Sequence, residues 1–303
     1  MDSKSQLKTL CFQPKQSKSN QLQNFKTCNF KSDPIKEGDY NDDEYNFKKV
    51  DREVRTRFEK TSTFPYSVHG LVRVDPGNGS YITGTGILIG PDFVLTAAHN
   101  IYDVKGSKQK YASIEFIPGI NEQEIPFGIF KVVESYVPSE FLKTWEKEDF
   151  ALLVLDGAPG NLAGYFGLHV AEKEIIKEKI KGLHVIGYPG YVRTKDERNK
   201  LKFLSAKGRH QLWGMGGDGW LEVDKKNGEF LINYSNIMTT GGQSGSGVFY
   251  YDEVTGEYYV IGVHILGRGG ESGYSSATWI TNTRFGQIEK WMIQARKNHI
   301  ARE

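Results

Sequence analysis

The sequence contains little cysteine, and all of it lies near one end. Among 303 residues only Cys11 and Cys28 are cysteines, both in the N-terminal stretch. The rest of the chain therefore forms no disulfide of its own and supplies no cysteine-rich metal site. This distribution agrees with a cytosolic protein, and equally with an exported one that uses no disulfides.

Long apolar runs and an excess of charge of one sign are also missing. No segment has the apolar length that a transmembrane helix needs, and the first residues, MDSKSQLKTLCF, lack the apolar core of a signal peptide. A formal net charge of +2 is not typical of proteins that bind nucleic acids or anionic membranes. We therefore expect no nucleic-acid partner and no insertion into a membrane.

Residues 1–49 form a region of distinct composition. Segments such as QPKQSKSNQLQNFK are rich in Lys, Asn, Gln and Ser, and their few apolar residues follow no period. Such a segment cannot bury enough apolar surface to fold alone. We predict a disordered extension here, either a plain tail or a pro-segment.

From about residue 64 onward, short apolar runs alternate with turn signals. Runs such as FVLTAAH, DFALLVL and YYVIGVHIL are bounded by Gly, Pro, Asp and Asn, and the chain holds 34 glycines, 16 tyrosines and 17 phenylalanines. Runs of this length at regular spacing indicate β-strands. The pattern predicts an all-β sandwich or pair of barrels, with a hairpin in EVTGEYYVIGV.

The last segment, RFGQIEKWMIQARKNHI, has a helical period instead. Its apolar residues recur three or four positions apart: Phe285, Ile288, Trp291, Met292 and Ala295. This spacing predicts an amphipathic C-terminal helix over residues 285–303 with one apolar face.

Three segments carry residues with catalytic potential, in the order His, Asp, Ser. FVLTAAHN places two small alanines before His99, which leaves room around an imidazole. EDFALLVL places Asp149 directly before an apolar strand, so its carboxylate is drawn out of water and needs a partner. TTGGQSGSGVF surrounds Ser244 with glycines, which let successive N–H groups point to one place.

Each segment alone has a plainer reading: a structural histidine, a solvated acid, a Gly-Ser loop. Together they provide every part of nucleophilic catalysis by serine. The hydroxyl needs a base, and the base needs an acid to fix its tautomer and stabilise its cation. Converging N–H groups can bind the oxyanion that forms on attack at a carbonyl. The order differs from the Ser, Asp, His order of α/β-hydrolases, and Ser246 breaks their G-x-S-x-G motif at Ser244.

The segments TAAH, DFALLVL and GGQSGSG, in that order, resemble the chymotrypsin-like serine proteases. Within that family, TTGGQSGSGVF followed by VIGVHILG, together with YVPSEF and IGYPG, is similar to the bacterial glutamyl endopeptidases. The resemblance covers roughly residues 50–293. It implies two six-stranded antiparallel β-barrels, residues 50–160 and 161–284. The apolar face of the C-terminal helix is expected to pack on the second barrel.

The resemblance implies a serine endopeptidase that hydrolyses peptide bonds through an acyl-enzyme. His99 and Asp149 would come from the first barrel and Ser244 from the second. The N–H groups of Gly242 and Ser244 would form the oxyanion hole. No metal or other cofactor is implied. The expected partners are protein or peptide substrates, and we expect a monomer.

The same resemblance implies a substrate preference. Relatives that cleave after Arg or Lys have an Asp six positions before the serine, where this chain has Met238. The residues that bind the substrate carboxylate in glutamyl endopeptidases correspond to His264 and Thr239, and both side chains can donate hydrogen bonds. The strand that pairs with extended substrate would follow: Ile265, Leu266 and Gly267. We expect cleavage after Glu or Asp; the alternative for His264 is a plain core histidine.

Two residues depart from the family pattern. Gln243 stands before the serine, where glutamyl endopeptidases usually have Asn and digestive enzymes Asp, and Gly247 stands where Pro is common. Neither change removes a catalytic group, but both bear on the geometry of the loop and on specificity.

The family also uses a freed N-terminal amine near the specificity pocket. Alignment of FPYSV places the equivalent start near Val50, after Lys48 and Lys49. We therefore expect the full-length chain to be a weakly active zymogen.

Three alternatives stay open at this stage. They are another specificity on the same fold, an inactive homologue that only binds peptides, and a periplasmic quality-control protease. The last is disfavoured because those enzymes continue into a peptide-binding module, whereas this sequence ends in its helix. The resemblance implies a secreted protein, whereas no signal peptide is readable, so the cytoplasm also stays open.

Overall fold

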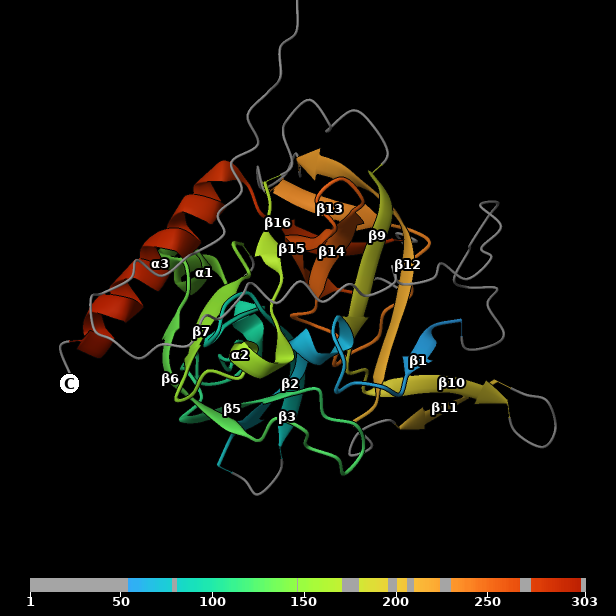
Figure 1. The fold of residues 1–303 in the computed structure, drawn as a ribbon, viewed down its shortest axis with the longest axis horizontal. Helices are drawn as coiled ribbons and strands as arrows, with labels where there is room; N and C mark the ends of the chain where they lie inside the picture. Colours follow the sequence, from blue (N-terminus) through green and yellow to red (C-terminus); the bar gives the residue numbers. More distant parts are fainter. Residues whose placement is uncertain are drawn as a thin grey trace, which may run out of the picture.

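Most of the described chain lies in two β-barrels (Figure 1). The computed structural model describes residues 54–77, 81–145, 147–170, 180–195, 201–205, 210–223, 230–267 and 274–300. The predicted extension over residues 1–49 and the predicted start near Val50 lie outside these residues.

The first barrel is closed by six antiparallel strands in the order β2-β3-β4-β7-β6-β5. Every residue of the two short strands β4 and β7 is buried. This explains why their sequences, FVLT and ALLVL, are apolar on both faces except at Thr96, whose hydroxyl donates to Thr85 O. Strand bounds are β2 (His69–Asp75), β3 (Ile82–Leu88), β4 (Phe93–Thr96), β5 (Ser113–Pro118), β6 (Phe130–Tyr136) and β7 (Ala151–Leu155).

The second barrel closes because β9 pairs with both β12 and β14. Its antiparallel order is β9-β12-β13-β16-β15-β14, so the predicted pair of six-stranded barrels is confirmed. The predicted hairpin is β14–β15, which turns at residues 253–256. Strand bounds are β9 (Ile180–Gly187), β12 (Leu212–Val223), β13 (Phe230–Tyr234), β14 (Gly247–Asp252), β15 (Glu257–Leu266) and β16 (Ser275–Trp279).

Smaller elements surround the barrels. A separate two-stranded sheet follows β9, and β8 pairs in parallel with β15. Short helices precede β2, follow β4 and lie on either side of β7. Their bounds are β8 (Gly167–Leu168), β10 (Tyr191–Lys195), β11 (Leu201–Ser205), η2 (Tyr66–Val68), η3 (Ala98–Asn100), α1 (Ser139–Thr144) and α2 (Gly160–Ala163).

One strand connects the beginning of the described chain to the far barrel. β1 (Thr56–Phe58) precedes the first barrel in sequence, yet it pairs with β12 of the second. The Phe58 ring stacks on Tyr66 at 4.6 Å between centroids, which fixes the end of β1 near the first barrel. The division of the chain at residues 160 and 161 stays a prediction.

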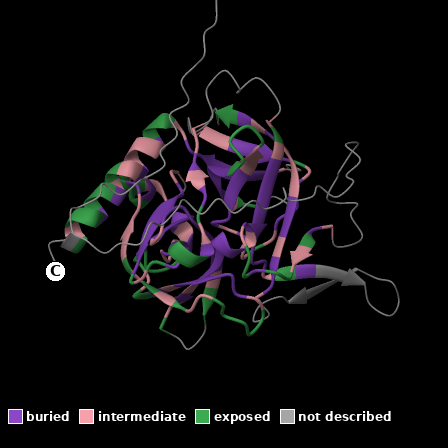
Figure 2. Cartoon of the chain, viewed as in Figure 1, coloured by how far each residue is buried: buried purple, intermediate pink, exposed green. Residues whose placement is uncertain are grey.

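Aromatic rings fill the junction between the barrels. Phe166 stacks on Tyr258 at 4.8 Å between ring centroids and meets Phe249 edge-on at 4.9 Å. Figure 2 shows buried residues throughout both barrels and in the region between them. Burial of this apolar surface holds the barrels together, so residues from both can form one site.

The C-terminal helix α3 (Asn282–Ile300) packs on the first barrel. Trp291 lies 6.0 Å from Tyr136 of β6 and 5.6 Å from Phe150 at the start of β7, between ring centroids. Arg296 forms an ion pair with Asp92 at 2.6 Å, and Figure 1 shows α3 alongside β6 and β7. The prediction that this helix packs on the second barrel is wrong, because its apolar stripe meets the aromatic residues beside β7. In the described part of the chain, no helix has both the length and the apolar character needed to cross a membrane.

Candidate active site

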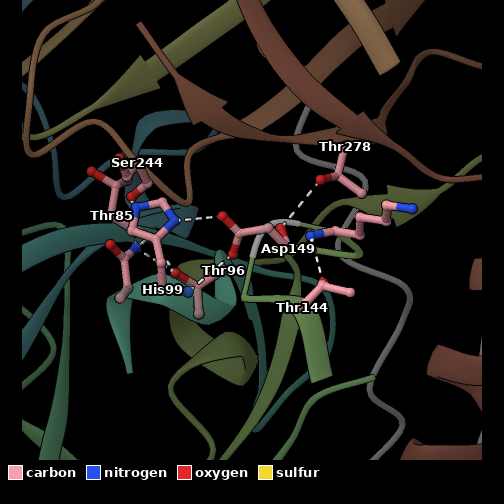
Figure 3. A network of polar contacts seen from close by, with 9 residues as sticks. Thr85, Thr96, His99, Thr144, Asp149, Ser244 and Thr278 are labelled. Carbon is pink, nitrogen blue, oxygen red and sulfur yellow. Dashed lines mark hydrogen bonds and ion pairs between the residues drawn. The ribbon is translucent and has the colours of Figure 1, made fainter. Parts of the chain in front are cut away.

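The candidate acid–base pair lies at the ends of two neighbouring strands. Residue His99 is in η3, just after β4, and Asp149 stands just before β7, the strand that pairs with β4. The imidazole Nδ1–H donates to Asp149 Oδ2 at 2.6 Å, and the backbone N–H of His99 donates to Oδ1 at 3.0 Å (Figure 3). Two bonds to one carboxylate fix the ring and its tautomer, which leaves Nε2 free to accept a proton.

Opposing effects act on the pKa of His99. Burial and the charge of Lys105 lower the pKa. The charge of Asp149 and its hydrogen bond raise the pKa by more. The net pKa lies above the ordinary value of 6.5. The imidazole is therefore a stronger base than a free histidine.

The segment that carries Asp149 is held from outside the first barrel. Thr278 Oγ1 of β16 donates to the backbone oxygen of Asp149 at 3.2 Å. The preceding residue, Glu148, has φ of 56°, and its carboxylate accepts two hydrogen bonds from Arg284 at 2.6 and 2.8 Å. Arg284 is 3% exposed and also donates to the carbonyl oxygens of Phe230 and Trp279. A buried bidentate guanidinium thus stabilises the left-handed residue beside Asp149.

The Ser244 loop needs glycine at two positions. Gly242 has φ of +94° and Gly245 has φ of +87°, a region that side chains disfavour. A Cβ on Gly242 would lie 2.6 Å from the carbonyl oxygen of Tyr188, and one on Gly245 would lie 2.1 Å from that of Thr85. The glycines around Ser244 in the sequence therefore reflect a tight backbone turn.

Two N–H groups of this turn correspond to the predicted oxyanion hole. The N–H of Gln243 donates to Thr240 O at 3.1 Å, and that of Gly245 donates to His264 O at 2.7 Å. Among the described residues, by contrast, the N–H groups of Gly242 and Ser244 donate to no protein oxygen. These are the two groups that the sequence predicted for an oxyanion hole.

The first barrel holds the Ser244 loop in place. Ser244 O accepts from the Thr85 N–H and from Asn100 Nδ2, both at 2.8 Å, and Thr85 Oγ1 donates to Gly242 O at 2.8 Å. Figure 3 shows Ser244 beside the imidazole of His99, on the side away from Asp149. In the described part of the chain no hydrogen bond joins the Ser244 hydroxyl to His99, and in sites without substrate such bonds are often long.

The candidate specificity residues lie in the second barrel. Thr239 is 8% exposed, and its Oγ1 lies 3.3 Å from Ser275 Oγ. His264 is 1% exposed, and its Nδ1 forms a hydrogen bond with the hydroxyl of Tyr234. Burial, together with repulsion from His99, lowers the pKa of His264 to about 3, so the ring is neutral near pH 7.

The predicted substrate strand stays paired with β16 as far as Leu266 and Ser276, but it leaves β14 earlier. The pairing of β15 with β14 ends at Val263, and the N–H of His264 donates to Ser246 O at 2.8 Å. The next residues, Ile265, Leu266 and Gly267, become progressively more exposed, with Leu266 at 42%. A Cβ on Gly267 would lie 2.7 Å from Thr239 Oγ1, which places this segment beside the candidate pocket.

A family model described as Trypsin matches residues 54–292. The chain belongs to the trypsin family. The predicted membership of the chymotrypsin-like serine proteases is thus confirmed.

Sequence relatives of this trypsin-family chain include two Bacillus proteins. It is 32% identical over 137 residues to the glutamyl endopeptidase of Bacillus licheniformis, which is 45% of this chain and 40% of that protein. It is 31% identical over 116 residues to a Bacillus subtilis protein named extracellular metalloprotease, which is 37% of this chain and 36% of that protein. The chain thus spans less than half the length of the curated relatives it matches.

Solved structures support the same fold. A Glu endopeptidase in complex with MPD has a TM-score of 0.59 and 26% identity over 78% of this chain and 95% of its own. The protease Anisep from Arthrobacter nicotinovorans has a TM-score of 0.55 and 19% identity over 75% of this chain and 93% of its own. At that lower identity the likeness concerns the fold alone.

Several residues around the site of this trypsin-family chain were missed from sequence. Asn100 follows His99 directly in TAAHN, so its place next to the site was readable. The others come from distant parts of the chain, and no local pattern marks them: Arg55, Thr85, Tyr234, Ser275 and Arg284.

Proposed function

We propose that this chain is a serine endopeptidase with His99, Asp149 and Ser244 as its catalytic triad. The observation that carries the proposal is the doubly hydrogen-bonded His99–Asp149 pair with Ser244 next to the free side of the imidazole. A plain structural histidine would not require a buried carboxylate on one side and a serine in a glycine turn on the other.

The geometry supports a two-step acyl transfer. His99 Nε2 takes the hydroxyl proton as Ser244 Oγ attacks the substrate carbonyl, and the oxyanion accepts hydrogen bonds from the N–H groups of Gly242 and Ser244. The imidazolium, stabilised by Asp149, then gives the proton to the leaving amine. Water, deprotonated by His99, then attacks the acyl-enzyme. The bond between the acyl carbon and Ser244 Oγ breaks, the imidazolium of His99 returns the proton to Ser244 Oγ, and the acid product leaves.

We further propose a preference for Glu before the scissile bond. If the Tyr234 hydroxyl donates to Nδ1 of His264, the imidazole proton resides on Nε2, where it can be donated to a substrate carboxylate. The hydroxyls of Thr239 and Ser275 form one hydrogen bond at 3.3 Å, so one of the two O–H groups stays available as a further donor. The buried Met238 brings no negative charge that would favour a basic residue.

The test is cleavage of a peptide library by the full chain and by a chain that begins at Val50, each beside a Ser244→Ala control. We expect Ser244-dependent cleavage after Glu, with a matched Gln peptide cut at least 100-fold more slowly. His264→Phe should reduce the Glu-to-Gln ratio and leave the rate on the Gln peptide within a few-fold. Cleavage after other residues would keep the triad and overturn the pocket. No Ser244-dependent cleavage from folded protein would favour a peptide-binding homologue.

We also propose that the full-length chain is a weakly active zymogen that is activated by a cut before Val50. The test compares the activity of the full chain with that of the chain that begins at Val50. The proposal predicts that the chain beginning at Val50 is the more active one, and it is wrong if an intact, uncut chain hydrolyses the peptide equally fast.

A further inference from the structure

A buried arginine from the start of the described chain reaches the loop that carries Ser244. Arg55 stands just before β1 and is 4% exposed. Its Nη1 donates to Gln243 Oε1 at 2.7 Å and to Thr240 Oγ1 at 3.0 Å, and its Nη2 donates to Tyr191 O at 2.8 Å. The guanidinium thus holds both ends of the short turn that contains Gly241 and Gly242.

The side chain of Gln243 makes hydrogen bonds at both ends of its amide. This residue is fully buried and directly precedes Ser244. Its Oε1 accepts from Arg55 and from the N–H of Thr240 at 3.0 Å, and its Nε2 donates to Trp213 O at 3.3 Å. Because Gln243 lies between the two candidate oxyanion donors, anchoring its side chain restricts both flanking peptide groups.

Pairing of β1 with β12 fixes the backbone position of Arg55, the residue just before β1. Thr56 pairs with Gly214 and Arg57 with Trp213 of β12. Trp213 is also the residue whose carbonyl accepts from Gln243. Hydrogen bonds therefore connect β1, β12 and the Ser244 loop to one another, in addition to the bonds between the strands of the barrel.

We propose that Arg55 is a positioning residue that keeps the turn 240–243 in the conformation in which the N–H groups of Gly242 and Ser244 converge. Two adjacent glycines have more conformational freedom than any other pair of residues, and the turn belongs to no strand. The buried guanidinium adds hydrogen bonds to Thr240 Oγ1 and Gln243 Oε1, which restrain the turn beyond its own internal bonds. This role rests on the proposed function, because the converging donors matter only for an oxyanion.

The position of Arg55 also has a consequence for processing. Arg55 follows Val50 in the sequence, so a cut before Val50 leaves the arginine in the chain. The restraint is therefore present in both the intact and the cut protein, and its effect adds to any effect of a freed N-terminal amine.

The experiment compares Arg55→Ala with Arg57→Ala in the full chain and in the chain beginning at Val50. Arg57 is a matched control because it lies in β1 and forms an ion pair with Glu122 at 2.8 Å.

The experiment measures the kinetic constants kcat and KM on the best peptide, and the amide hydrogen exchange of residues 239–246. For Arg55→Ala we expect kcat to fall about 10- to 100-fold with KM within threefold, since a disordered oxyanion loop acts mainly on the transition state. Exchange in residues 239–246 should become faster, whereas Arg57→Ala leaves both quantities unchanged.

Arg55→Lys keeps the charge but loses the fork of the guanidinium, so an intermediate kcat and intermediate exchange are expected. The inference is overturned if Arg55→Ala matches Arg57→Ala in kcat or in exchange. Should Arg55→Ala fail to fold, Arg55→Lys decides, and wild-type kcat and exchange in that variant would overturn the inference. Absence of Ser244-dependent hydrolysis in the wild type would refute the proposed function instead, and the exchange data would still show whether Arg55 orders the loop.

Discussion

The two barrels support their parts of the site in different ways. In the first barrel, His99 and Asp149 stand at the ends of β4 and β7, which pair with one another, and two hydrogen bonds at 2.6 and 3.0 Å join them. In the second barrel, Ser244 lies in a turn outside the strands. The hydrogen bonds between acid and base are made within the first barrel, although Thr278 and Arg284 also hold the Asp149 segment from outside it. The Ser244 loop depends on Thr85, Asn100 and Arg55 from elsewhere.

The difference follows from what each half must do. A base and its acid must only be held next to one another, and the paired strands β4 and β7 bring His99 and Asp149 together. An oxyanion hole needs adjacent N–H groups aimed at one point, and only a glycine-containing turn gives that backbone shape. Because glycine brings conformational freedom, the restraint has to come from neighbours. Changes at His99 and Asp149 should therefore act on proton transfer, and changes around the Ser244 loop should act on the order of the loop as well.

The largest effect is expected for Asp149→Asn. Loss of the carboxylate leaves His99 in the wrong tautomer, so kcat should fall about 10,000-fold while the fold is retained. Steady-state kinetics and a thermal melt measure the two quantities. A fall of less than tenfold would contradict the assigned role of Asp149.

Gly242→Ala should act on the loop rather than on proton transfer. Its Cβ would meet the Tyr188 carbonyl oxygen at 2.6 Å and force a change from φ of +94°. Displacing one donor of the oxyanion hole should lower kcat by about 100- to 1000-fold. Gly241→Ala is the control, because a Cβ there meets nothing within 4 Å, and its kcat should stay within a few-fold. Equal effects at the two glycines would contradict the account of the turn.

Thr85→Val tests the restraint that the first barrel provides. The change removes the hydroxyl that donates to Gly242 O and accepts from the Tyr188 N–H, each within 2.9 Å. Buried groups left without partners should cost about 1–3 kcal/mol in the free energy of unfolding, measured in urea. We expect a smaller fall in kcat, about tenfold. Thr83→Val, two residues earlier in β3, should change neither quantity appreciably.

The smallest predicted effect is a shift in the pH profile. Protonated His99 cannot take the Ser244 proton, so kcat/KM should fall as pH is lowered through a midpoint above 6.5, since Asp149 raises the pKa of His99. For stability, the raised pKa means that the pair contributes fully below about pH 6.5 and that this contribution is lost as pH rises through the folded pKa. Asp149→Asn should move the kinetic midpoint downward. A midpoint that stays in place would contradict the stated cause.

The sequence predicted most of the fold, and it marked residues that the structure brings together in the candidate site, because both rest on local patterns. Short bounded strands indicated the barrels, and TAAH, DFALLVL and GGQSGSG marked His99, Asp149 and Ser244. The restraints on the site were not predictable in this way. Arg55 and Gln243 are 188 positions apart, and a single arginine leaves no periodic signal. The apolar stripe of α3 predicted that the helix packs on a barrel, but it held no information on which one.

The most direct test of the central account is labelling by diisopropyl fluorophosphate followed by peptide mapping. This reagent reacts with a serine hydroxyl that a base has activated, and its adduct occupies the oxyanion site. The account predicts one labelled residue, Ser244, with labelling strongly reduced in His99→Ala and in Gly242→Ala. An unlabelled Ser244, or a Ser244 that reacts equally fast in His99→Ala, would contradict it.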